Sequence, residues 1–362
     1  MSERHTSSRP ESARMLSLVE FILLLLAFGS SLAWTPVTIA RQQSYATGTV
    51  TIVLPDRVVA GEPATLAVLD ADGRLAPGVT VNLGDDHQQV TTDRTGRALF
   101  TVASSAGVLL ASASGASSAA LVDSGSAAES RQTVTIALVV SLHEPFSVCG
   151  TGLRGNADSN QVRINGQPAL VMAASPECLT VLPGPKAEPG PAQISVEAAP
   201  ARWTANTTLV SLESESPKPA LLPGKKGSLI VRVHGSDRRL RILVENQTPG
   251  VLRFPRGDMQ DLLTSGGSPN LASVEIQAIR SGDFSFDARV LPVPDADAAR
   301  RYLLAAQPLA PRNLGNDVAK LAGKLSGHPR DFGRVRRELD RIRVMTFAGD
   351  FRTLLDAARA AL

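Results

Sequence analysis

Residues 59–101, VAGEPATLAVLDADGRLAPGVTVNLGDDHQQVTTDRTGRALFT, decide the fold of this chain. Apolar side chains alternate with polar ones in short runs, as at Val79 and Val81, and turn residues separate the runs at Asp70–Gly73 and Asp93–Gly96. A period of two indicates strands with one buried face, and each Gly can supply the positive φ that a tight turn needs. The stretch therefore predicts antiparallel strands of a β-sandwich.

The same stretch resembles the bacterial immunoglobulin-like domains of the invasin and intimin type. Its matching motifs are an AG-x-P-A start at Ala60, a PG-V-x-V run at Pro77 and a T-T-D-x-x-G-x-A-x-F run from Thr91. This resemblance implies an immunoglobulin-like sandwich over residues 45–125. The motifs form turns and core, so the resemblance carries over no catalytic residue.

A second module is predicted over residues 132–200. From Phe146 it reads FSVCGTGLRGNADSNQVRINGQPALVMAASPECLTVLPGPKAEPGPAQISVE. The V-x-G-x-G-L turn, the N-x-V-x-I-NG-x-x-A hairpin and the PG-x-x-x-I-x-V strand resemble an IPT/TIG domain, which is also an immunoglobulin-like fold. Asn165-Gly166 is by itself a strong signal for a two-residue hairpin turn.

The rest of the chain divides into strands followed by helices. Alternating runs over residues 205–293 predict a third β-sandwich, for which no family resemblance is evident. Residues 294–362 have helical spacing instead, and we expect helices over the following segments: 295–306, 316–325, 331–345 and 351–362. Their apolar faces must be covered, so we expect them either to dock on the third sandwich or to contact a partner through the helices.

The N-terminus predicts export. Arg4, Arg9 and Arg14 precede an apolar stretch, residues 15–34, with the centre FILLLLAF. This layout is typical of a secretory signal peptide, although the stretch is also nearly long enough for a single membrane anchor. Residues 1–34 are therefore interpreted as a hydrophobic helix of one kind or the other, and the remainder is expected in the periplasm, at the cell surface or secreted.

The chain has two cysteines, Cys149 and Cys178, both within the second module. In an exported protein, such a pair predicts a disulfide, while two unpaired buried thiols are the alternative.

Composition and motifs argue against several functions. Aromatic residues are only 4% of the chain, which disfavours base stacking and sugar stacking, so we expect no nucleic-acid partner. Net charge is +3, and the basic excess lies at the C-terminal end. The Arg-rich helix faces there are interpreted first as surfaces exposed to solvent, and second as contacts with a membrane surface or a polyanion. No nucleophile elbow, zinc motif or phosphate loop occurs, so no catalytic, cofactor-binding or metal-binding residue is predicted.

Two polar loops of the third module are the candidate binding segments, because sandwich folds place binding residues on loops at one end. Their candidate residues are Asn246, Thr248, Thr264, Ser265 and Asn270.

The fold class predicted is thus mainly β: tandem immunoglobulin-like sandwiches with an N-terminal hydrophobic helix and a small C-terminal helical region. The function predicted is a non-enzymatic, extracytoplasmic scaffold, spacer or protein-interaction surface at the bacterial cell envelope, whose partner is another envelope or extracellular protein. One alternative is an accessory carbohydrate-binding protein. Another is an enzyme with its site in the third module, which would require Arg253, Asp258, Asp261 and His234 to gather in one cleft.

Overall fold

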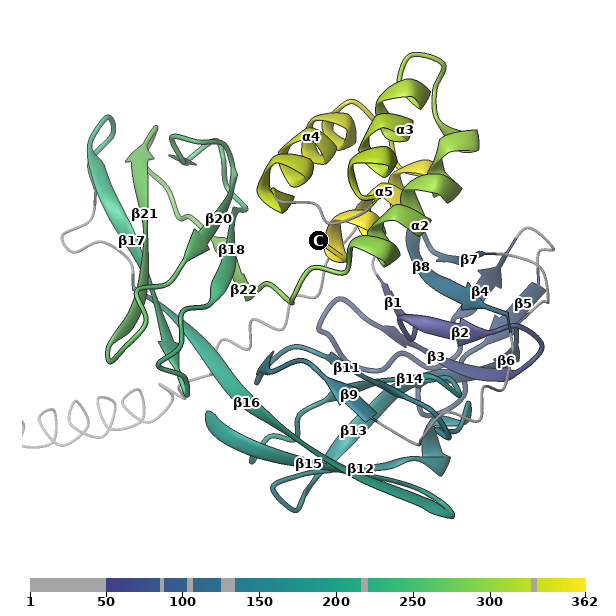
Figure 1. Cartoon of the computed structure of the whole chain (residues 1–362). Coiled ribbons are helices and arrows are strands. Elements are labelled where there is room, and N and C mark those ends of the chain that lie inside the picture. The colour runs from purple at the N-terminus through teal and green to yellow at the C-terminus, as the bar shows by residue number, and fades with distance from the viewer. Residues whose placement is uncertain (1–49, 85–87, 103–106, 125–133, 216–220, 327–330) are drawn as a thin grey trace, which may run out of the picture. The chain divides into compact units, whose positions relative to one another are not determined.

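A computed structural model describes residues 50–84, 88–102, 107–124, 134–215, 221–326 and 331–362. The signal or anchor predicted for residues 1–34 lies outside these residues. Among the helices within the described ranges, none combines the length and the hydropathy that a bilayer span requires. Strands make up the first part of the described chain and helices its end, so the predicted mainly β class is confirmed (Figure 1).

The first β-sandwich is built from two antiparallel layers with the alternation seen in the sequence. On β6 (Arg97–Thr101), Ala98 and Phe100 point into the core, whereas Leu99 between them is exposed. One layer contains β1 (Thr51–Val53), β3 (Pro63–Leu69) and β6 (Arg97–Thr101). The other contains β2 (Arg57–Val59), β8 (Ala116–Asp123), β7 (Val108–Ala113), β4 (Thr80–Leu83) and β5 (Gln88–Thr91), in that order. Within this order, β2 and β8 are parallel.

The second β-sandwich follows the same principle. One layer contains β9 (Val134–Ile136), β11 (Phe146–Gly150), β14 (Cys178–Leu182) and β13 (Gln167–Ala174). The other contains β12 (Gln161–Ile164), β15 (Gly190–Ala198), β16 (Ala201–Glu215) and β10 (Val139–Ser141), and the short 3-10 helix η2 (Ala157–Ser159) precedes β12. β13 pairs with β12 near its start and with β14 beyond it, so it joins the two layers.

The predicted hairpin turn joins β12 and β13. Asn165 has φ +49° and Gly166 has φ +79°, and Ile164 pairs with Gln167. Positive φ at both central residues is the geometry that favours an Asn-Gly pair in a two-residue turn. The turn prediction is confirmed.

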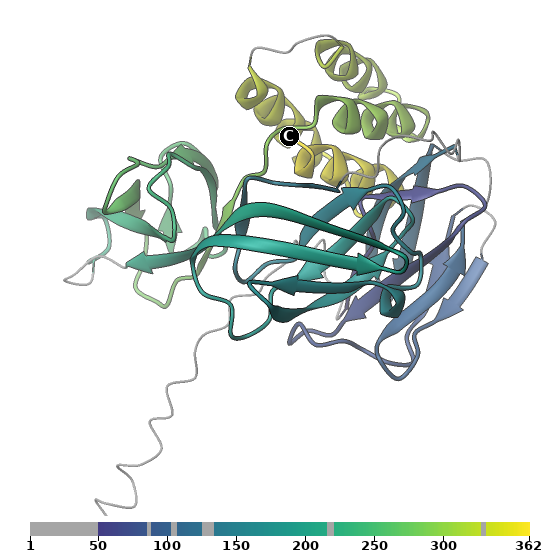
Figure 2. The same cartoon turned by 60° about the horizontal axis from the view of Figure 1, so that its bottom comes forward.

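The third β-sandwich begins on a strand of the second. β16 pairs with β15 from Ala201 to Leu209 and then with β17 (Lys226–His234) from Ser211 to Glu215. Figure 2 shows β15 and β16 as the long teal hairpin. The predicted boundary at residues 200–205 therefore falls inside a hairpin. The remaining strands are β21 (Asn270–Ala278) and β19 (Leu252–Arg253) in one layer, with β20 (Met259–Leu263), β18 (Arg241–Asn246) and β22 (Phe286–Val290) in the other.

Small apolar cores fill the joints between sandwiches. Between the first and the second, five buried side chains from β1, β3 and β13 pack together: Val53, Ala67, Leu69, Met172 and Ala173. Between the second and the third, Val210, Val233 and Leu240 do the same. The joints are thus packed interfaces made of residues in strands or directly beside them.

The C-terminal region forms four α-helices, as predicted: α2 (Ala296–Ala306), α3 (Gly315–Lys324), α4 (Phe332–Val344) and α5 (Asp350–Ala360), with the 3-10 helix η3 (Gln307–Leu309) after α2. Asp295 caps α2 by accepting a hydrogen bond from the Ala298 amide at 2.9 Å. Asp331 caps α4 in the same way, accepting from Arg334 at 2.8 Å.

The expectation that the helices dock on the third sandwich is wrong for their apolar faces. Their core includes Leu121 of β8, with Val108, Leu110 and Ala119 packed against it, so it lies on the first sandwich. The physical reason is that the β7–β8 pair is apolar on both faces. Leu109 and Ala120 pack in the core of the first sandwich, whereas Leu110 and Ala119 lie on the opposite face. The outer face needed its own cover.

Contact between the helices and the third sandwich is polar. Arg336 of α4 is buried, and its Nη1 donates to Asp261 Oδ2 of β20 at 2.7 Å. Arg241 also donates to that carboxylate. Burial, together with the charge of Arg241, lowers the pKa of Arg336 to about 10.

The predicted disulfide is confirmed. Cys149 and Cys178 face each other on β11 and β14 and are joined, with a Cα–Cα distance of 4.1 Å.

Replacing both cysteines by serine is expected to lower the free energy of unfolding by about 3 kcal/mol, because the bond closes a loop of 29 residues in the unfolded chain. Urea unfolding of the double variant and of the parent, each under oxidising conditions, measures the difference. A parent that loses no stability on reduction would contradict the expectation.

Gly155 makes a close approach between the first and second sandwiches. A Cβ at this position would lie 1.8 Å from the carbonyl oxygen of Pro63. Next to it, the Thr65 hydroxyl donates to the Gly155 carbonyl at 2.6 Å and accepts from the Ala157 amide at 3.1 Å. Only glycine allows two backbone segments to meet this closely.

Gly155→Ala is expected to destabilise the protein by about 1–3 kcal/mol or more, because backbone must move to admit the methyl group. Gly107→Ala is the matched control, since Gly107 has nothing within 4 Å of its Cβ position. Thermal or urea unfolding compares the two variants. Equal stability of the two variants would show that the backbone at the joint moves without a cost in free energy, and would contradict the prediction.

Candidate functional site

The first predicted loop of the third sandwich uses its polar side chains internally. Asn246 is buried, and its side-chain amide donates to the Leu252 carbonyl at 2.8 Å and to Asp258 Oδ1 at 3.1 Å. Its Oδ1 accepts from the Thr248 amide at 3.0 Å. The Thr248 hydroxyl in turn accepts from the Ser285 amide at 3.1 Å. These contacts shape the turn between β18 and β19.

The second predicted loop is built similarly. Thr264 is buried, and its hydroxyl accepts from the Leu240 amide at 2.9 Å. Asn270 is also buried, and its side-chain amide donates to the carbonyls of Ser236 and Arg238 at 3.0 and 2.7 Å. Of the three candidates here, only Ser265 is exposed, and its hydroxyl accepts from the Leu271 amide at 3.0 Å.

The two loops lie at opposite ends of β18. Thr264 bonds to Leu240, just before the strand, whereas Asn246 is its last residue. The structure therefore does not bring the five candidate residues together, and most of their polar atoms already have partners within the fold.

The residues of the enzyme alternative are also dispersed. His234 ends β17 and contacts Glu213 at 2.8 Å. Arg253 on β19 pairs with Gln277, which pairs with Lys226 at the other end of β17. Asp261 belongs to the opposite layer, so the cleft that this alternative required does not form.

A cavity of about 890 Å³ lies where the sandwiches and the helices meet. Its lining comes from β1, from the segment β9 to β11, from β22 and the residues after it, and from α2 and α5. Its volume is within the roughly 300–1,000 Å³ typical of ligand sites in proteins. This cavity is the candidate site.

Two sides of the cavity are strand edges. Thr51 to Leu54 line it, and within the described chain β1 pairs only with β3. Arg289 and Val290 of β22 also line the cavity, and among the described residues β22 pairs with β18. Unpaired strand edges present backbone donors and acceptors to which an extended peptide can add.

Asp56 places a carboxyl group in this cavity. The residue is exposed to solvent, although the surrounding protein still displaces part of the bulk water near its carboxyl group. This desolvation raises the pKa of Asp56. A hydrogen bond from the Ser147 side chain and the charge of Arg57 oppose the rise, whereas the charge of Asp295 adds to it. Proton uptake or an added positive charge would stabilise the carboxyl group.

Glu144 is another of the carboxyl groups that line the cavity, in the turn between β10 and β11. It is partly buried, and burial raises its pKa to about 7. The charge of Arg289 opposes this rise and that of Asp287 adds to it. Glu144 thus changes charge near neutral pH.

Asp123 ties three parts of the chain together beside the cavity. Arg301 of α2 donates to its Oδ1 at 2.6 Å, and Arg57 of β2 approaches its Oδ2 at 3.4 Å. Burial would raise the pKa of Asp123, but the hydrogen bond and charge of Arg301 lower it. Glu177 of the second sandwich shares a hydrogen bond with Asp123, and burial followed by this contact raises the pKa of Glu177.

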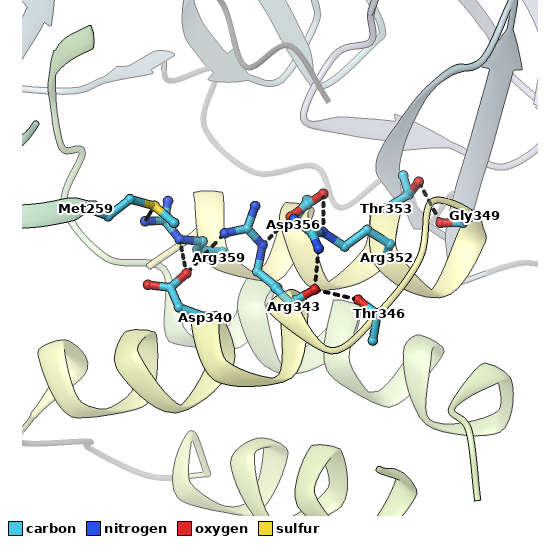
Figure 3. A network of polar contacts seen from close by, with 9 residues as sticks. All are labelled: Met259, Asp340, Arg343, Thr346, Gly349, Arg352, Thr353, Asp356 and Arg359. Atoms are coloured by element: carbon cyan, nitrogen blue, oxygen red, sulfur yellow. Dashed lines mark hydrogen bonds and ion pairs between the residues drawn. The ribbon is translucent and has the colours of Figure 1, made fainter. Parts of the chain in front are cut away.

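A buried ion network positions α5, whose Arg359 lines the cavity (Figure 3). Arg343 donates to Asp356 and, at 3.0 Å, to Asp340. Arg359 donates to the same Asp340 at 2.5 Å and to the sulfur of Met259 at 2.8 Å. The network joins α4, α5 and β20.

Sequence patterns could not have found this site. Asp56, Glu144 and Arg289 are single charged residues, the first two between strands and the third in β22, and about 90 to 150 positions separate each from the next; no motif contains them. Within the described residues, no group of three or more His, Cys, Asp or Glu side chains could hold a metal ion.

Comparisons with known proteins show only distant likeness. No family model matches the chain, and no curated protein matches it. The plexin A4 extracellular region is 12% identical, with a TM-score of 0.25, over 71% of this chain and 24% of that chain. The present chain thus spans about a quarter of that ectodomain.

Two further solved structures are similar at the same level. The four N-terminal Ig domains of Dscam1 isoform 7.44 are 9% identical, with a TM-score of 0.21, over 68% of this chain and 72% of that chain. The SGBP-B protein of a Bacteroides ovatus mixed-linkage glucan utilization locus, in complex with a heptasaccharide, is 11% identical, with a TM-score of 0.22, over 70% of this chain and 67% of that chain. TM-scores this low carry no argument about function.

Glu144→Gln is expected to stabilise the protein at pH 8, by about 1–3 kcal/mol. The folded-state pKa of about 7 lies above the ordinary 4.5. Ionised Glu144 therefore destabilises the folded state above pH 7, and this penalty fades as pH falls towards 4.5. Urea unfolding of variant and parent at pH 8 and pH 4.5 measures it. An equal difference at both pH values would refute the prediction.

Proposed function

We propose that this protein is a non-enzymatic, extracytoplasmic scaffold of the bacterial cell envelope that holds a segment of a partner protein in the junction cavity. The observation that carries the proposal is a cavity of about 890 Å³ bordered by β1 and β22, each of which pairs with a single strand among the described residues. An extended segment could pair with either edge while its side chains enter the cavity.

The charges of the cavity favour a segment that carries Lys or Arg. Asp56 and Glu144 have raised pKa values because burial outweighs the opposing charges of Arg57 and Arg289, so both carboxyl groups would gain from additional positive charge. A cationic side chain placed between them would supply that charge. A partner segment combining extended backbone with a basic side chain therefore suits the site.

The packed joints favour a scaffold over a spacer. A spacer built from beads on flexible linkers would not need β16 to enter two sandwiches or β3 to pair with β13. We infer that the modules act together, and that residues of all three sandwiches contribute to binding.

Family and domain assignments belong to the same proposal. We assign residues 45–125 to an invasin or intimin-type domain, 132–200 to an IPT/TIG-like domain and 205–293 to a third sandwich, with β16 shared by the last two. Residues 1–34 remain a proposed signal or anchor. The disulfide supports an oxidising compartment, since such bonds persist outside the cytosol.

The glycan alternative lacks support from the side chains of the cavity. Trp203 is buried in the second core, and the two aromatic residues that line the cavity, Phe146 and Tyr302, are buried as well. Sugar binding generally uses exposed aromatic faces. A protein partner therefore fits the site better.

Photo-cross-linking in intact cells tests the proposal. A photoreactive amino acid at Thr51 or at Arg289 is expected to give adducts with the same partner, because both positions line the cavity. Ser228, exposed on β17 and not among the lining residues, is the control position. Immunoblotting and mass spectrometry identify the adducts. Adducts of equal yield at Ser228, or none at either cavity position, would exclude the cavity as the partner site.

A further inference from the structure

The last residue of α4 and the turn that follows it form an exposed apolar tip. The tip consists of Val344, Met345 and Phe347, whose exposed fractions are 81%, 53% and 95%. Single exposed apolar side chains are ordinary on protein surfaces, but neighbouring ones in a short turn indicate a contact surface. Nothing in the cavity or in the joints between sandwiches uses these side chains.

The fold holds this turn in place. The Met345 amide donates to the Ile342 carbonyl at 3.1 Å, and the Thr346 hydroxyl donates to the Arg343 carbonyl at 2.8 Å. Arg352 also donates to that carbonyl, and Figure 3 shows Thr346 and Arg352 converging on it. The polar residue of the turn is therefore bonded inward while its apolar neighbours project outward.

A row of exposed arginines on α4 leads to the tip. Arg334, Arg337 and Arg341 are exposed at spacings of three and four residues, and Val344 follows three residues later, so they share one helix face. Arg334 pairs with Glu338 at 3.2 Å. Within the described part of the chain, no ion pair involves Arg337 or Arg341.

Apolar side chains beside unpaired arginines complement an anionic lipid surface. The apolar groups can enter the boundary between headgroups and acyl chains while the guanidinium groups bind lipid phosphates. We propose that the α4–α5 turn is a membrane-contact element that inserts Val344, Met345 and Phe347 into an anionic bilayer surface, with Arg337 and Arg341 on the headgroups. This inference does not depend on the partner cavity or on the fate of residues 15–34.

The test places a fluorescent reporter at the tip of the full chain. Phe347→Trp is mixed with vesicles containing bromine-labelled lipid, made either of phosphatidylcholine with phosphatidylglycerol or of phosphatidylcholine alone. Leu222→Trp is the matched control, because Leu222 is also apolar and 69% exposed but lies outside the helices. Signals are taken relative to the parent, so that a retained N-terminal anchor contributes equally to every sample.

The expected result is lipid quenching and a blue shift of the indole at position 347 in anionic vesicles, several-fold stronger than at position 222. Adding Arg337→Glu and Arg341→Glu should lower the affinity for anionic vesicles, measured from the quenching titration, by roughly 10- to 30-fold. High salt should lower this affinity as well. Circular dichroism checks that these surface variants remain folded.

Three outcomes would overturn the proposal. They are equal quenching at positions 347 and 222, an equal signal in neutral and anionic vesicles, and a response at position 347 to envelope proteins but not to vesicles. The last would assign the tip to a protein partner.

Discussion

Continuous strands are the constraint on which this structure depends. β16 completes a sheet of the second sandwich and then starts one of the third, and β13 bridges the layers of the second while touching β3 of the first. A strand that belongs to two sheets cannot act as a flexible linker, because its backbone hydrogen bonds are satisfied on both sides of the joint. The joints, and the cavity beside them, follow from this continuity.

The C-terminal helices bury the outer apolar face of the first sandwich. The β7–β8 pair carries apolar side chains on both faces, and one sandwich core can cover only one of them. Covering the outer face brings Arg301 to Asp123 and Arg359 to the cavity, so an apolar requirement determines where the charges meet. The pKa of Asp123 therefore depends on Arg301, a neighbour that comes from a distant part of the chain.

The polar loops of the third sandwich illustrate how composition can mislead. Asn, Thr and Ser are the residues expected in binding loops, but they are also the residues that hydrogen-bond backbone groups in turns. Asn246, Thr264 and Asn270 perform the second task, with their side chains buried against amides and carbonyls. In contrast, Asp56 and Glu144 carry no local signal, and only their surroundings distinguish them from ordinary surface acids.

The sequence alone determined the local features: alternating strands, the Asn165-Gly166 turn, the helices after residue 294 and a cysteine pair able to join. These depend on side chains a few positions apart, or on chemistry that a single pair of residues defines. Only the tertiary structure decided which sandwich the helices cover, where β16 changes partner and which carboxyl groups share a cavity. Those outcomes depend on how whole strands and helices pack, and the helices lie more than 100 residues beyond the sandwich that they cover, so periodicity and motifs hold no information about them.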